Sequence, residues 1–94
     1  MATRYTTGEL KAAVAKLSGW DAGDNVISRT FAFADHSAAM GFVVRVAMAA
    51  EVLDHHPDLR IVYNKVELNL NTHDAGGVTD LDIQLATKCN ELAG

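Results

Sequence analysis

Three of the four histidines lie in the second half of the chain, in two separate groups. His55 and His56 directly precede Pro57, and His73 follows a run of residues that is typical of a strand. Imidazole titrates near neutral pH and is the side chain best suited to donating and accepting protons there. We therefore predict an acid–base site, and we expect the fold to bring the two groups together.

An acidic residue is placed to support the first group. If the helix that precedes Pro57 continues to His55, Glu51 lies four residues before His55 on the same helix face. The Glu51 carboxylate would then hold the His55 ring in one tautomer and favour its protonated form, as would the helix C-terminus. Pro57 favours an extended conformation at His56, so the two adjacent histidines should point in different directions.

The second group has polar neighbours. His73 is flanked by Asn71, Thr72 and Asp74, whose side chains offer hydrogen-bonding groups for a polar heterocycle. His36 has no such setting, and we interpret it as a solvated residue at the start of a helix.

A metal site is the alternative for the same residues. The three imidazoles, together with Glu51 or Asp82, could supply the ligands of a zinc ion. Adjacent histidines chelate one ion poorly, however, and ligand pairs on a helix are usually three or four residues apart. The spacing therefore favours acid–base chemistry, and we predict no metal, with zinc binding as the rival hypothesis.

Capping signals and hydrophobic periodicity predict the order helix, strands, helix, strands, helix. Thr6 with Glu9, and Thr79 with Asp82, have the spacing of capping boxes, and Asp35 or Ser37 is expected to cap the middle helix. Strands joined by short turns favour an antiparallel sheet and the α+β class. The predicted elements are a helix from 6 to about 18, a strand over 26–33 with a hairpin partner near 20, a helix over 37–54, a strand over 61–71 with a break near 64, and a helix from 79.

Alternation within the second strand region indicates a sheet that is covered by helices on one side only. Val62, Val66, Leu68 and Leu70 are expected on the buried face. In the first strand, Arg29 interrupts the apolar face, which suggests a strand at the edge of the sheet.

The middle helix is apolar on almost its whole circumference. A helix of this kind must be buried on nearly all sides, and a domain of 94 residues has a thin core. We therefore predict a homo-oligomer whose subunits meet at this helix; the alternative is a helix buried centrally in its own domain. One stripe comprises Phe42, Val46, Ala49, Ala50 and Leu53, and a second stripe comprises Met40, Val44, Met48 and Val52.

Length and composition exclude several classes. We expect one domain, residues 1–94, and a net charge of -4 without a basic stripe argues against direct binding of nucleic acid or of an anionic membrane. Cys89 is the only cysteine, so it can form neither an internal disulfide nor a thiolate metal site, and we expect it to be a small buried helix residue. The first ten residues lack the apolar segment of a signal peptide, and we predict a cytoplasmic protein.

Several short segments carry a specific combined spacing. They are Glu51–Pro57 (EVLDHHP), Val62–Val66 (VYNKV), Thr72–Asp74 (THD) and Asp82–Ala86 (DIQLA), with Gly19-Trp20 and Gly41–Ala47 (GFVVRVA) before them. Together they closely resemble the pterin-4a-carbinolamine dehydratase family, and the resemblance covers nearly the whole chain after Gly19.

This resemblance implies a fold and an activity. The fold is a four-stranded antiparallel sheet with three helices on one side, in dimers or tetramers formed partly through the long middle helix. The reaction is loss of water from a 4a-hydroxy-tetrahydropterin to give a quinonoid dihydropterin, as in the recycling of a tetrahydrobiopterin-type cofactor, without a metal or an organic cofactor. Because relatives also serve as dimerisation partners of transcription factors, a coactivator-type binding module is the alternative function.

The resemblance also implies the site. The essential histidines are His55, His56 and His73, and the supporting acid is Glu51. The implied pterin contacts are Asp54, His55 and His56 in one segment, and Asn71, Thr72, His73 and Asp74 in the other. Many relatives carry Arg just before the aspartate that matches Asp82, whereas this chain has Leu81, which puts any contribution of that Arg in doubt.

The implied chemistry suits these residues. Departing hydroxide must be protonated and a ring nitrogen must lose its proton, so we assign His55 and His73 to proton transfer in either order. His56 is expected to orient the pterin ring, and Glu51 to steady a histidine. Asp82 is a possible further site residue, or only the helix partner of Thr79.

Overall fold

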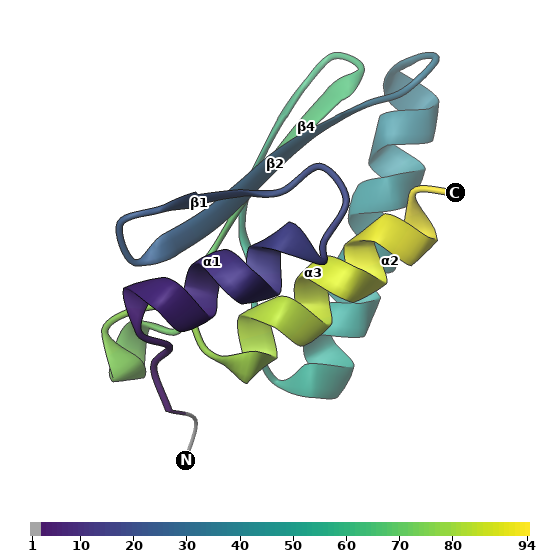
Figure 1. Ribbon diagram of the computed structural model, residues 1–94. Coiled ribbons are helices and arrows are strands. Elements are labelled where there is room, and N and C mark those ends of the chain that lie inside the picture. Colours follow the sequence, from purple (N-terminus) through teal and green to yellow (C-terminus); the bar gives the residue numbers. More distant parts are fainter. Residues whose placement is uncertain (1–2) are drawn as a thin grey trace.

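The computed structural model describes residues 3–94, which form a four-stranded antiparallel sheet with three α-helices on one face (Figure 1). This is the predicted α+β architecture. The elements are α1 (Thr7–Ala15), β1 (Asp21–Gly23), β2 (Val26–Ala32), α2 (His36–Leu53), β3 (Asp58–Val62), β4 (Lys65–Leu70), the short 3₁₀ helix η1 (His73–Ala75) and α3 (Asp80–Leu92).

Three helix starts follow the predicted capping signals. Thr6 and Thr79 each form a complete capping box, with Glu9 and Asp82 respectively, and the Asp35 carboxylate accepts a hydrogen bond from the Ala38 N–H at the start of α2. Each of these bonds satisfies backbone donors that the first helical turn leaves free. Helix α1 nevertheless ends at Ala15, earlier than expected.

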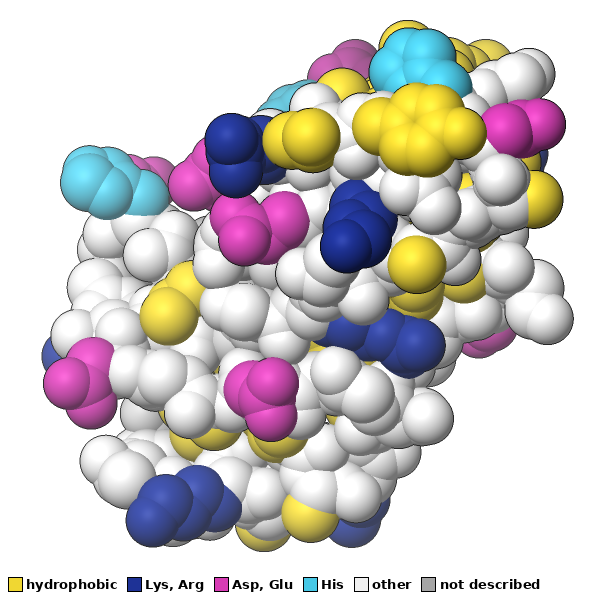
Figure 2. All heavy atoms as spheres, turned by 90° about the horizontal axis from the view of Figure 1, so that it is seen from above, with side chains coloured by type: hydrophobic (Ala, Val, Ile, Leu, Met, Phe, Trp, Pro, Cys, Tyr) yellow, Lys and Arg dark blue, Asp and Glu magenta, His cyan; other side chains and the backbone are white. Residues whose placement is uncertain are grey.

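The sheet has the strand order β1-β2-β4-β3, and its core-facing side chains pack against the helices. The Phe42 ring of α2 packs against both Phe31 and Phe33, with ring centroids 4.8 and 4.9 Å away, and Phe31 and Phe33 stack on each other at 6.5 Å. The side of the molecule away from α1 and α3 carries acidic and basic side chains interspersed (Figure 2). The largest fully buried side chains are Phe42, Ile27, Leu68, Leu70, Leu85, Val46, Val66, Val78, Thr79, Asp82 and Cys89.

The second strand region is a hairpin rather than one strand. Val62 pairs with Lys65, so the expected break near Asn64 is a tight turn in which Tyr63 adopts a left-handed φ of 52°. The His36 Nδ1–H donates to the Tyr63 carbonyl (2.7 Å), and the Asn64 amide donates to the Phe33 carbonyl (2.8 Å), which ties the turn to its neighbours. The turn moves Val62 to the open face, where it is half exposed, so its predicted burial is wrong.

Strand β2 lies inside the sheet, between β1 and β4, so the prediction of an edge strand is also wrong. The half-buried Arg29 is accommodated because its guanidinium lies 4.1 Å from the centroid of the Phe31 ring. It also donates to the Ser18 carbonyl (2.6 Å) and to Asn90 Oδ1 (2.7 Å). The same Asn90 oxygen accepts from the Trp20 indole N–H (2.8 Å), which joins α3 to the loop before β1.

Helix α2 has one buried side and one uncovered side. Ala39, Phe42, Val46 and Ala50 are buried in the core. The second predicted stripe is exposed, with fractions that rise from 40% at Met40 through Val44 and Met48 to 87% at Val52. The helix is long and apolar enough to cross a membrane by length and composition, with a mean hydropathy of 1.3, but its buried side packs into this core.

Cys89 is a buried, free thiol on α3, as predicted. Burial raises its pKa to about 12, because a thiolate loses its hydration in the core. The side chain therefore stays protonated and packs as a small apolar group.

We expect Asn90→Ala to lower the free energy of unfolding by about 1–3 kcal/mol, because the Trp20 and Arg29 donors lose a shared acceptor. Urea unfolding followed by Trp20 fluorescence measures the change. Glu91→Ala is the matched control, since its exposed ion pair with Lys88 contributes little. Equal unfolding midpoints for the two variants would contradict the role of Asn90.

Candidate active site

The register of the sheet brings the two groups of histidines to one end of the fold. Asp58, the first residue of β3, pairs with Asn69, which is next to the last residue of β4. His55 and His56 precede β3, and His73 follows β4. Antiparallel pairing therefore places both groups at the same end of two neighbouring strands.

His55 does not lie on the face of α2. The helix ends at Leu53, and Asp54 adopts a left-handed conformation (φ 50°, ψ 43°) that turns the chain away from the helix axis. The predicted pair of Glu51 and His55 is therefore wrong, because helical spacing does not extend past the cap. The His55 Nε2 atom instead lies 2.5 Å from Asp82 Oδ1 of α3.

Glu51 supports the other histidine of the pair. Its Oε1 atom lies 2.5 Å from His56 Nε2, and both side chains are largely exposed, at 77% for Glu51 and 55% for His56. Exposed pairs are screened by water and contribute little to stability. The two adjacent histidines thus point to different carboxylates, one buried and one in solvent, which agrees with the expectation that they face different directions.

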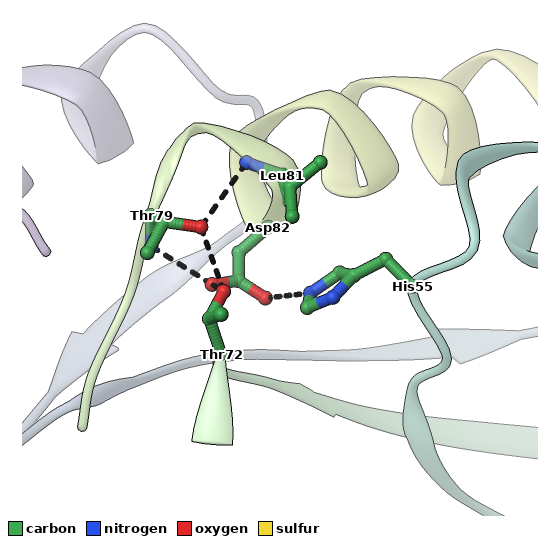
Figure 3. Close-up of polar contacts among 5 residues, drawn as sticks. All are labelled: His55, Thr72, Thr79, Leu81 and Asp82. Atoms are coloured by element: carbon green, nitrogen blue, oxygen red, sulfur yellow. Dashed lines mark hydrogen bonds and ion pairs between the residues drawn. The ribbon is translucent and has the colours of Figure 1, made fainter. Parts of the chain in front are cut away.

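Asp82 is the centre of the buried network in Figure 3, and its side chain has no exposed surface. One oxygen, Oδ1, faces His55. The other, Oδ2, accepts from the Thr72 hydroxyl (2.8 Å) and from the Thr79 backbone N–H (2.9 Å). Asp82 is therefore both the capping-box partner of Thr79 and the hydrogen-bond partner of His55, so it is more than the helix partner of Thr79.

The network fixes the direction of its hydrogen bonds. An ionised carboxylate only accepts, so Thr72 donates to Asp82, and the Thr79 hydroxyl donates to Thr72 Oγ1 at 2.7 Å. The Thr79 oxygen in turn accepts from the Leu81 N–H at 3.3 Å. By the same rule His55 carries its proton on Nε2, and in the neutral ring Nδ1 keeps a free lone pair.

The segment after β4 enters the same network through Thr72. A bridge to Gly77 fixes its backbone, with an N–H···O distance of 2.8 Å. His73 and Asp74 begin η1 directly after it, and both are exposed, as are Asn71 and Asp54. Of the four residues predicted in this segment, Thr72 is thus the one that hydrogen-bonds to the carboxylate beside His55.

Within residues 3–94, no three His, Cys, Asp or Glu side chains converge in an arrangement that could hold a metal ion. His55 and His56 each face a separate carboxylate instead. The donor geometry of the described residues is thus one of two separate histidine–carboxylate pairs.

Comparison with known proteins identifies the family. The sequence model described as pterin 4 alpha carbinolamine dehydratase matches residues 3–92. The chain belongs to this family. A relative from Nitrobacter hamburgensis, named as a candidate pterin-4-alpha-carbinolamine dehydratase, is 53% identical over 99% of this chain and 94% of its own length. A relative of the same name from Sulfurisphaera tokodaii is 46% identical over 95% of this chain and 96% of its own length.

Solved structures share the fold of this family member. A crystal structure from Brucella melitensis, described as a transcriptional coactivator/pterin dehydratase, matches with a TM-score of 0.94 and 45% identity over 98% of this chain and 100% of that chain. A pterin dehydratase-like protein described as a RuBisCO assembly factor of the alpha-carboxysome matches with a TM-score of 0.69 and 22% identity over 81% of this chain and 90% of its own. At that identity the second likeness shows the fold alone.

Sequence reasoning missed the parts of the network that depend on long-range contacts. The hydroxyl of Thr72 was expected to face a heterocycle, and the hydroxyl of Thr79 was assigned to capping alone. The one local signal was the Thr79–Asp82 capping box, which placed a carboxylate at the start of α3. The sequence offered Asp82 as a possible site residue, but no local pattern indicated that it, rather than Glu51, would meet His55.

We expect Asp82→Asn to destabilise the protein by about 3 kcal/mol or more, because an amide presents N–H groups to donors that need an acceptor. The same change should release the Nε2–H tautomer of His55, which ¹⁵N NMR of the imidazole nitrogens reports directly. Asp58→Asn, at an exposed position at the start of β3, is the matched control. An unchanged His55 tautomer in Asp82→Asn would contradict the assigned network.

Proposed function

We propose that this chain removes water from a 4a-hydroxy-tetrahydropterin to give a quinonoid dihydropterin by histidine general acid–base catalysis. Membership of the family supports the pterin and the dehydration. The observation that carries the proposal is the contact between His55 and the buried Asp82 carboxylate, because it holds one imidazole at the end of the sheet where His73 also lies.

The elimination needs two proton transfers. Hydroxide leaves carbon poorly unless it is protonated as it departs, and the neighbouring ring nitrogen must lose a proton. One imidazolium as the acid and one neutral imidazole as the base meet both needs. Each proton transfer of this kind typically accelerates a reaction by about 10²–10⁴-fold. We assign these transfers to His55 and His73, which come from different segments of the chain and so can address different atoms of one bicyclic ligand.

Asp82 prepares His55 for this role without touching the substrate. It holds Nε2–H, so that Nδ1 is the nitrogen that exchanges a proton with the pterin. When His55 becomes protonated, the adjacent carboxylate stabilises the positive charge, and its burial strengthens that interaction. Asp82 is thus a positioning residue in the proposed mechanism, held in turn by Thr72 and Thr79.

His56 and Glu51 form the exposed part of the proposed site. We assign His56 to orienting the pterin ring, with Glu51 fixing the imidazole. Asp54 and the segment of residues 71–74 supply polar groups to the heterocycle. Leu81 is half-buried and uncharged, so this chain offers no cation at the position where the resemblance leads us to expect Arg in many relatives.

The proposed setting is the reducing cytoplasm. The chain has a single cysteine, Cys89, which is free, and the absence of an internal disulfide is typical of proteins in reducing compartments. The proposed reaction consumes no organic cofactor and no metal. The proposed substrate is a 4a-hydroxy-tetrahydropterin of the tetrahydrobiopterin type.

We expect His55→Ala and His73→Ala each to lower the kcat for dehydration of a 4a-hydroxy-tetrahydropterin by about 10²-fold or more, because each removes a proton-transfer group. Stopped-flow absorbance of the quinonoid product measures the rate against the spontaneous reaction. Circular dichroism should show that both variants remain folded, because the His73 side chain is exposed and because Asp82 keeps the donors of Thr72 and Thr79 when His55 is removed. His55→Ala should nevertheless have a lower thermal midpoint, since the buried carboxylate loses one donor.

His36→Ala is the control, because this histidine lies at the start of α2 and contacts the β3–β4 turn rather than the site. Wild-type rates in both site variants would refute the assignment.

The wild-type protein should also keep its dehydratase activity after dialysis against a metal chelator. Stoichiometric zinc that is required for activity would replace this mechanism with a metal-assisted one.

The exposed stripe of α2 supports a second proposed property, self-association. Met40, Val44, Met48 and Val52 recur at every fourth residue and form an apolar surface along the helix. Beside this stripe a groove of about 370 Å³ runs between α2 and α3, with Val52 in its lining. We propose that a second copy of this chain covers the surface. A coactivator-type binding module on the same surface remains the alternative, since the Brucella melitensis structure is described in those terms.

We expect the wild-type chain to be a dimer or tetramer in solution and Met48→Glu to shift it to the monomer, because a charge would be buried in an apolar interface. Size-exclusion chromatography with light scattering measures the mass. Ala12→Glu adds the same charge to an exposed position of α1, a helix outside the proposed interface, and should leave the assembly intact. A wild-type chain that is monomeric at high concentration would overturn the proposed self-association.

A further inference from the structure

The segment before α1 crosses the loop that leads into α3. The Tyr5 backbone N–H donates to the Val78 carbonyl at 2.8 Å, and the Tyr5 hydroxyl donates to Asp80 Oδ1 at 2.7 Å. Their acceptors, Val78 and Asp80, are the residues directly before and after Thr79. Tyr5 therefore holds Thr79 from both directions along the chain, although the two are distant in sequence.

Thr79 is the residue through which this contact reaches the site. It is fully buried, its backbone N–H donates to Asp82 Oδ2, and its hydroxyl bonds to Thr72. The Asp82 carboxylate in turn positions the imidazole of His55. A displacement of Thr79 would therefore move a donor to Asp82 and, with it, the carboxylate that fixes His55.

The opposite side of the same loop is held by the end of β4. Gly77 pairs with Thr72 in an isolated bridge, so the loop lies between Thr72 and the segment of Arg4 and Tyr5. The stem of Arg4 passes so close to Gly77 that a Cβ there would lie 3.0 Å from it. A side chain at position 77 would thus crowd the Arg4 side chain, which would have to shift, whereas glycine leaves room for it against the loop.

Tyr5 is itself fixed by the start of α1. Thr6 is the N-cap, with the Thr6 N–H donating to Glu9 Oε1 (2.8 Å) and the Glu9 N–H donating to Thr6 Oγ1 (3.2 Å). Tyr5 precedes the cap and Leu10 follows the box, which are the two positions of a hydrophobic staple. The capping box therefore sets the direction in which Tyr5 leaves the helix, towards the loop.

We propose that Tyr5 is a positioning residue for the site, which acts through Val78, Asp80 and Thr79 to hold the Asp82 carboxylate against His55. Tyr5 itself touches neither the histidines nor the proposed substrate. The kinetic consequence rests on the proposed dehydratase function, whereas the structural consequence at His55 does not.

The hydroxyl that makes this contact is a donor throughout the physiological range. The hydrogen bond to Asp80 is the largest cause that raises the pKa of Tyr5 above 10.0. A raised pKa in the folded state contributes stability that is fully present below the unfolded value. That contribution is lost only as the pH rises through the folded value, so the contact is intact at neutral pH.

The test compares Tyr5→Phe, which removes only the hydroxyl, with two changes of its partner. Tyr5→Phe and Asp80→Ala should each lower kcat roughly two- to tenfold while KM stays near the wild-type value, because a net hydrogen bond is lost away from the substrate. Both should also broaden or shift the ¹⁵N signal of His55 Nε2. Asp80→Asn keeps an acceptor oxygen for Tyr5, so its kcat and its His55 ¹⁵N signal should both stay close to those of the wild type.

Glu91→Gln is the matched control, because it removes an exposed charge from the same helix without contact to the segment before α1. A lower thermal midpoint for Tyr5→Phe with wild-type His55 signals would make Tyr5 merely structural and overturn the proposal. If the wild-type chain dehydrates no pterin, the dehydratase function fails, and the His55 signals still decide the role of Tyr5. Unchanged His55 signals in both Tyr5→Phe and Asp80→Ala would likewise overturn the proposed positioning role of Tyr5.

Discussion

The Asp82 carboxylate is fully buried, and a buried charge is tolerated only where hydrogen-bond donors replace the water that it has lost. Its donors come from three parts of the fold: the segment after α2 through His55, the end of β4 through Thr72, and the start of α3 through Thr79. Among the described residues, no buried side-chain nitrogen or oxygen lacks a hydrogen-bond partner, so the network is complete. Because removal of any one donor leaves a buried charge short of a partner, these three segments must keep their relative positions.

This constraint gives the two adjacent histidines different environments. His55 is held by a buried carboxylate and has one nitrogen committed to it, whereas His56 is paired with the exposed Glu51 and stays in contact with solvent. Such a difference suits a site in which one imidazole has a fixed orientation for proton transfer and the other adapts to a ligand. The family supplies the chemical context, a pterin dehydration, and the buried network supplies the physical basis for assigning a distinct role to His55 in this chain.

The hydrophobic side chains of α2 serve two different surfaces. One side of the helix packs into the core around Phe42, whose ring contacts those of Phe31 in β2 and of Phe33 just after it. The other side presents large apolar side chains to solvent along the whole helix, up to Val52 near its end. Exposed apolar surface of this continuity is typical of an interface. Because α2 also ends next to His55, an association through this helix would lie close to the proposed site.

The sequence alone determined the features that depend on neighbours in the chain. The capping boxes at Thr6 and Thr79, the cap at Asp35 and the two stripes of α2 were predictable, because they rest on hydrogen bonds within one turn and on helical periodicity. Tertiary structure decided which carboxylate each histidine meets. The left-handed cap at Asp54 turned His55 away from Glu51, and only the packing of α3 against the sheet end supplied Asp82. Contacts between residues so distant in the chain follow from how whole elements pack together, which no local pattern encodes.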